Sequence, residues 1–83
     1  MEKLIGKITH YYNKLGVGII ELSDSLKNGD KIHFKGHSTD FEQVVDSMQI
    51  EHQPVAEAKT GEIIGLKLIN PVREGSEVFL VTE

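Results

Sequence analysis

The sequence contains no cysteine among its 83 residues. Small secreted domains usually depend on disulfides to compensate for a thin hydrophobic core, so the absence of cysteine indicates a reducing compartment. It also excludes thiolate chemistry and cysteine-ligated zinc. We therefore expect a cytoplasmic protein.

Long apolar segments are also absent. No stretch approaches the roughly 20 apolar residues that a membrane span needs, and the start at Met1–Ile5 lacks the apolar run of a signal peptide. A chain of 83 residues is expected to form one domain, covering 1–83. A domain this small buries only about 60% of its unfolded surface, which leaves little room for a deep cleft.

Positive charge is scarce. Nine lysines and arginines stand against 13 acidic residues, and the formal net charge is −4. Non-specific nucleic-acid binding depends on basic side chains that displace counterions from phosphates. Any nucleic-acid contact would therefore have to be local and specific for shape. The simplest interpretation of the net charge is that it keeps the protein soluble.

The residues of common catalytic and metal sites do not form a recognisable pattern. Zinc needs three or four ligands that converge, and no histidine pair has the usual spacing with a third ligand nearby, so no metal site is predicted. The four histidines are His10, His33, His37 and His52. Acid–base work by Asp40, Asp46 or Glu51 would need a cleft. We predict no cofactor and no enzymatic activity.

The apolar pattern has a period of two rather than 3.6, which indicates strands. Lys31–Gly36 alternates most clearly, and Gln43–His52 is the longest candidate strand, ended by Pro54. About six strands with frequent turns predict an all-β fold, a small closed six-stranded antiparallel β-barrel. Closure would remove exposed strand edges. The predicted core comprises Ile8, Ile19, Ile32, Phe34, Met48, Leu66 and Val78.

Two turns resemble each other. Leu26–Ile32 and Val72–Val78 both read apolar, basic, polar, glycine, polar, charged, β-branched. Each is expected to launch a strand with alternate buried residues, with a glycine at positive φ in the turn. Short helical turns are possible at Ser38–Glu42 and Pro54–Ala58.

Five short motifs occur in an order typical of one known family. They are Ile5–Ile8, Leu26–Ile32, Val45–Gln49, Ala58–Leu66 and Val72–Val78. Their order and spacing resemble the second domain of elongation factor Tu over nearly the whole chain. That resemblance implies a translation-type β-barrel. No GTP binding is expected, because the phosphate-binding loop of a GTPase is absent.

Within this superfamily, the chain is most similar to the small C-terminal barrel of collagenase-like bacterial peptidases. The similarity is carried by Lys35–Phe41 and Ser47–His52. Relatives of those peptidases act in hydroxylation of transfer and ribosomal RNA. In elongation factors the corresponding barrel helps to hold the aminoacyl end of tRNA. The resemblance implies a similar surface here.

One strip of residues is a candidate binding surface. Lys31, His33 and Lys35 should point outward from the same strand, and Tyr11 and Tyr12 could stack on bases. Positive charge beside aromatic rings is typical of sites for single-stranded RNA or a tRNA end. The alternative is an ordinary solvated strand face.

The predicted function is therefore that of a non-catalytic binding module, associated with tRNA, ribosomal RNA or translation. The alternative is a protein-interaction module that docks onto a collagenase-like peptidase or an RNA-modifying enzyme. In that case an exposed apolar patch near Ile50 and Val55 would be the docking surface.

Overall fold

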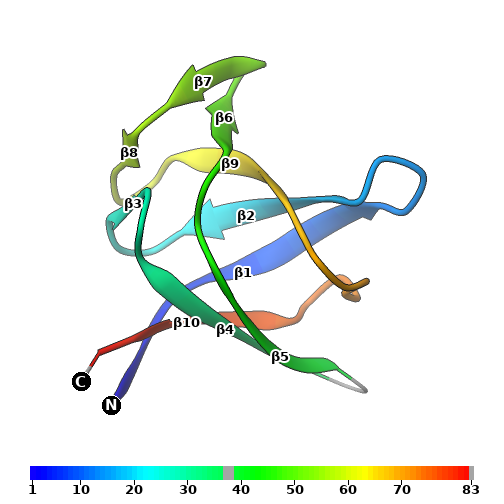
Figure 1. The fold of residues 1–83 in the computed structure, drawn as a ribbon, viewed down its shortest axis with the longest axis vertical. Helices are drawn as coiled ribbons and strands as arrows, with labels where there is room; N and C mark the ends of the chain where they lie inside the picture. The colour runs from blue at the N-terminus through cyan, green and yellow to red at the C-terminus, as the bar shows by residue number, and fades with distance from the viewer. Residues whose placement is uncertain (37–38, 83) are drawn as a thin grey trace.

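The computed structural model describes residues 1–36 and 39–82, and this part of the chain is built from strands without a helix (Figure 1). Accordingly, no helix in it is long and apolar enough to cross a membrane. The strands are β1 (Glu2–Tyr12), β2 (Val17–Leu22), β3 (Leu26–Lys27), β4 (Lys31–Gly36), β5 (Thr39–Val44), β6 (Met48–Ile50), β7 (Gln53–Val55), β8 (Glu57–Ala58), β9 (Ile63–Lys67) and β10 (Glu77–Val81).

Eight of these strands form one antiparallel sheet in the order β5-β4-β10-β1-β2-β9-β6-β7, and β3 pairs with β8 separately. The long strand β1 lies in the middle. Its residues 2–7 pair with β10 and its residues 6–12 pair with β2, with irregularities between Leu4 and Gly6 and between Ile8 and His10. Such bulges bend a strand, and Figure 1 shows the sheet curling around one interior.

The prediction of an all-β fold is confirmed, but the prediction of a closed six-stranded barrel is not. The eight-stranded sheet stays open in the described residues, between β5 and β7. A side chain bridges part of this opening. The buried amide of Gln43 donates to the carbonyl of Lys67 at 3.0 Å and accepts from the amide of Ile69 at 2.9 Å. One glutamine thus takes the place of two ladder hydrogen bonds.

The interior of the curled sheet holds a single apolar cluster. Six of the seven predicted core residues are buried there: Ile8, Ile32, Phe34, Met48, Leu66 and Val78. The prediction that Ile19 belongs to the core was wrong, because Ile20 occupies the inward position of β2, opposite Ile8 and Ile64. A shift of one residue moves a side chain to the other face of a strand.

The predicted strand over Gln43–His52 is also wrong in extent. The chain leaves β5 after Val44, turns inward so that Val45 is buried, and resumes in β6. Glu51 and His52, both at positive φ, then form a two-residue turn into β7. Pro54 lies within β7 rather than ending a strand, which an edge position permits. The two predicted helical turns are also wrong. Residues 39–42 of the first are extended in β5, and Ser38 lies outside the described residues; the second, Pro54–Ala58, is extended in β7 and β8.

The two similar turns share their geometry, and a third copy joins them. In each, an amide donates to the carbonyl three residues earlier: Asp30 to Lys27, Ser76 to Arg73 and Glu62 to Lys59. Gly29, Gly75 and Gly61 take positive φ in these turns. The apolar residues that begin each motif are buried, namely Leu26, Val72 and Ala58. The strands β4, β10 and β9 therefore each begin directly after a turn of the same type.

Candidate functional site

The solvent side of β1, β10, β4 and β5 carries the main concentration of interacting polar side chains, and we call it the outer face. Register places Leu4, Phe79, His33 and Glu42 in one row across these four strands. Because side chains alternate along a strand, the inward neighbours Ile32, Phe34 and Val78 anchor this row to the core.

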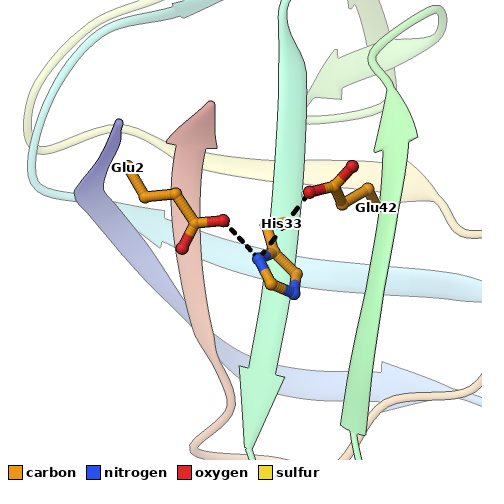
Figure 2. Close-up of side chains that lie close together, drawn as sticks. All are labelled: Glu2, His33 and Glu42. Carbon is orange, nitrogen blue, oxygen red and sulfur yellow. Dashed lines mark hydrogen bonds and ion pairs between the residues drawn. The ribbon is translucent and has the colours of Figure 1, made fainter. Parts of the chain in front are cut away.

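His33 lies at the centre of the outer face, with 12% of its side chain exposed. Its Nδ1 contacts Oε2 of Glu2, which comes from the start of β1 (Figure 2). The same nitrogen is 4.0 Å from Oε2 of Glu42 on β5. On the other side of the ring, Nε2 contacts Oδ1 of Asp40. One imidazole is therefore surrounded by three carboxylates from two strands that are distant in sequence.

Two lysines complete the network. Lys35 Nζ lies 2.9 Å from Oε1 of Glu2, and Lys31 Nζ lies 3.1 Å from Oε1 of Glu42. Lys35 also sits 5.2 Å from the centroid of the Phe79 ring. Each of the two glutamates therefore directs one oxygen toward His33 and the other toward a lysine.

These contacts shift the ionisation of the central groups. Hydrogen bonds to Asp40 and Glu2 raise the pKa of His33 against the opposing effect of burial. Hydrogen bonds from Lys35 and His33 lower the pKa of Glu2. The hydrogen bond to Glu2 raises the pKa of Lys35. All three shifts favour the charged forms, so the cluster stabilises positive charge at the imidazole.

The strip predicted from the sequence is present as a geometric feature. Lys31, His33 and Lys35 do share the outer face, yet each is paired with a carboxylate. Sequence reasoning missed Glu2, Asp40 and Glu42 as their partners. The alternation of Thr39–Val44 was the available signal, since reading it as a strand would have placed Asp40 and Glu42 on one face. The RNA-binding role of the strip stays a prediction.

The two tyrosines do not join the strip. Tyr11 and Tyr12 lie on β1 opposite Gly18 and Val17, seven or more residues beyond Leu4, which is about 23 Å along a strand. Tyr11 packs against the core, whereas Tyr12 is exposed, so they do not offer one stacking surface.

His10 and His52 lie apart from His33. The ring centroids of His10 and Tyr12 are 4.3 Å apart, and Nδ1 of His10 lies 2.9 Å from Oε2 of Glu74. His52 is in the exposed β6–β7 turn, and His37 lies outside the described residues.

Apolar surface accompanies the charged cluster. Leu4 and Val44 are exposed on the outer face, and Phe79 and Val81 are partly exposed between them. A shallow hollow of about 370 Å³ adjoins Leu4 and is also lined by Lys35, Gly36, Gly75 and Glu77. By contrast, Ile50 and Val55 are partly buried against the core, so the exposed patch predicted there is absent.

No protein-family model matches the chain. The chain is 48% identical over 80 residues to an uncharacterized protease of Methanocaldococcus jannaschii, an alignment that covers 95% of this chain and 20% of the relative. The chain thus spans about a fifth of the length of the curated relative it matches.

Two solved structures share the fold, and both are of the C-terminal domain of a putative U32 peptidase from Geobacillus thermoleovorans. One has a TM-score of 0.90 at 18% identity and covers 96% of this chain and 93% of that domain. The other, a selenomethionine variant, has a TM-score of 0.87 at 19% identity and covers 92% and 96%. The predicted resemblance to the C-terminal barrel of collagenase-like peptidases is therefore confirmed. The resemblance to elongation factor Tu stays a prediction.

Proposed function

We propose that this chain is a non-catalytic docking domain for a peptidase-like enzyme, and that its outer face packs against the body of that enzyme. The single observation that carries the proposal is the match of 95% of the chain to one fifth of a much longer uncharacterized protease. A domain that accounts for a fifth of such a protein has a large neighbour to pack against.

The position of the chain ends favours the outer face as the contact. The amino group of Met1 donates to the carbonyl of Thr82 at 2.5 Å, and the amide of Thr82 donates to the carbonyl of Met1 at 2.7 Å. Glu2 and Val81, the next residues inward, already belong to this face. An enzyme body connected at either end would begin beside it.

The composition of the face also suits a protein partner better than RNA. Leu4 and Val44 supply apolar contact, whereas Lys31 and Lys35 are already paired with glutamates. RNA phosphates would have to displace those carboxylates, and the net charge of −4 would oppose their approach. Protein interfaces contain both apolar and polar contacts, and this face offers a charged cluster around His33 with Leu4 and Val44 on either side of it.

The test uses the remaining four-fifths of the Methanocaldococcus jannaschii protease, produced without the matching segment, as the binding probe. We expect it to shift backbone NMR signals of Leu4, Phe79 and Val44 in this chain. Leu4→Glu should weaken binding about tenfold or more, equivalent to about 1.4 kcal/mol, because it places an unpaired charge in the contact.

Leu15→Glu is the matched control. Leu15 is also exposed and apolar, but it lies in the β1–β2 turn, away from the outer face, so its substitution should leave binding unchanged. Equal effects of the two substitutions would contradict the proposal. Shifts at Lys31 and Lys35 caused instead by a tRNA acceptor-end oligonucleotide, and weakened steeply by salt, would replace docking with RNA binding.

A further inference from the structure

We propose that Glu2, His33 and Glu42 form a binding site for a divalent transition-metal cation of the Zn²⁺ type. Each residue offers one ligand atom, and the three atoms lie within 4.8 Å of one another (Figure 2). They come from β1, β4 and β5, strands held in fixed register by the sheet. The site goes beyond the docking function and does not depend on it.

The outer partners of the three ligands support this assignment. Nε2 of His33 contacts Asp40, which would keep a proton on Nε2 while a metal ion takes the place of the proton that Nδ1 shares with Glu2. Lys35 and Lys31 hold the Oε1 atoms of Glu2 and Glu42, and this leaves the Oε2 atoms directed at Nδ1. Metal-binding histidines and carboxylates commonly have such second contacts, which set the tautomer and the orientation of each ligand.

Small side-chain movements would complete the geometry. Ligands at about 2.1 Å from zinc are about 3.4 Å apart in a tetrahedral site. Glu42 Oε2 lies 4.0 Å from Nδ1 and needs to approach by a fraction of an ångström, whereas Glu2 must withdraw from its direct contact. Both glutamates are long enough to do this without moving the strands. The fourth position would face solvent.

The ligand set also indicates which cations should bind. An imidazole nitrogen with two carboxylate oxygens suits Zn²⁺. Mg²⁺ prefers oxygen ligands in a strict octahedron and usually keeps several waters. The two lysines reduce the negative charge around the site, so we expect affinity weaker than that of zinc sites built from thiolates.

The test is a titration of the full chain with Zn²⁺, followed by calorimetry and by the NMR signals of the histidine rings. We expect saturable binding of one ion, with the largest shifts at His33. His33→Gln should weaken binding at least tenfold, and Glu42→Gln should weaken it as well. A melting curve for each variant verifies that the fold is retained, and Mg²⁺ at the same concentration should leave the His33 signals unmoved.

His10→Gln is the matched control, because His10 also faces a carboxylate, that of Glu74, but lies outside the three-ligand set. Its zinc affinity should equal that of the unmodified chain. The proposal is overturned if Zn²⁺ does not bind, if folded His33→Gln binds it as tightly as the unmodified chain, or if Mg²⁺ shifts the His33 ring equally. None of these outcomes bears on docking, because no partner protein is present.

Discussion

At the scale of single residues, His33 shows how strongly neighbours define a side chain. In isolation it is one basic member of an alternating strand. In the folded chain, Glu2, Asp40 and Glu42 surround it and turn a basic strip into a balanced network. Because Lys31 and Lys35 are already paired with glutamates, phosphates would have to displace those carboxylates to reach them.

A prediction at the same scale concerns the backbone conformation of Gly29. Gly29 adopts a φ of 95°, and no described atom lies within 4 Å of the position that a Cβ would take. The cost of Gly29→Val is therefore backbone strain rather than a clash, and we expect a loss of about 1–3 kcal/mol in the free energy of unfolding. Urea denaturation would measure it.

Lys31→Ala is the reference substitution for this measurement. Lys31 is exposed and its pairing with Glu42 is a surface interaction, so its removal should cost at most about 0.5–1 kcal/mol. Equal losses for the two substitutions would show that the positive φ of the turn has no special role in stability.

At the scale of elements, one turn motif recurs three times. A glycine turn directly precedes each of the strands β4, β9 and β10, and a buried residue lies on either side of each turn. Two of the copies were recognisable from their sequence, Leu26–Ile32 and Val72–Val78. The third, at Ala58–Ile64, begins with a smaller apolar residue and was not recognised as a repeat. A shared hydrogen-bond pattern reveals it.

The β6–β7 hairpin differs, because its turn lacks glycine. Glu51 and His52 adopt φ of 50° and 64°, the left-handed region that a two-residue turn of this kind requires. His52→Gly should relieve about 1–2 kcal/mol of strain and lose about 0.5–1 kcal/mol to greater freedom of the unfolded chain. We expect a net gain of a few tenths to about 1 kcal/mol, seen as a rise of a few degrees in Tm.

Gln49→Gly in the neighbouring strand β6 is the contrasting variant. Glycine at an ordinary strand position should destabilise the fold by about 0.5–1 kcal/mol. If both glycine variants lowered Tm, strain in the turn would not be a significant term.

At the scale of the whole molecule, Gln43 links β5 to the chain at the end of β9 across the open side of the sheet. Its amide satisfies the carbonyl of Lys67 and the amide of Ile69 across the open side of the sheet. Gln43→Leu preserves the bulk but leaves both backbone groups unpaired. Since an unsatisfied buried group costs about 1–3 kcal/mol and water can partly reach this site, we expect a loss near the low end of that range.

Hydrogen exchange would locate the effect. The amide of Ile69 should exchange much faster in Gln43→Leu, whereas it should remain protected in Gln53→Leu, a control on the exposed strand β7. Unchanged protection of Ile69 in Gln43→Leu would mean that the two sides of the sheet are held together by packing alone.

The sequence by itself determined the all-β class, the glycine turns, and six of the seven predicted core residues, because these depend on local alternation and backbone preference. Sequence also placed Lys31, His33 and Lys35 on one face. Only the tertiary structure decided that the long predicted strand breaks between β5 and β6, that Ile20 replaces Ile19 in the core, and that Gln43 spans the open side of the sheet. The contact between Glu2 and His33 could likewise not be predicted from local patterns. Glu2 reaches His33 across 31 positions of sequence, and a contact of that separation exists only once β10 has brought β1 and β4 to its two sides.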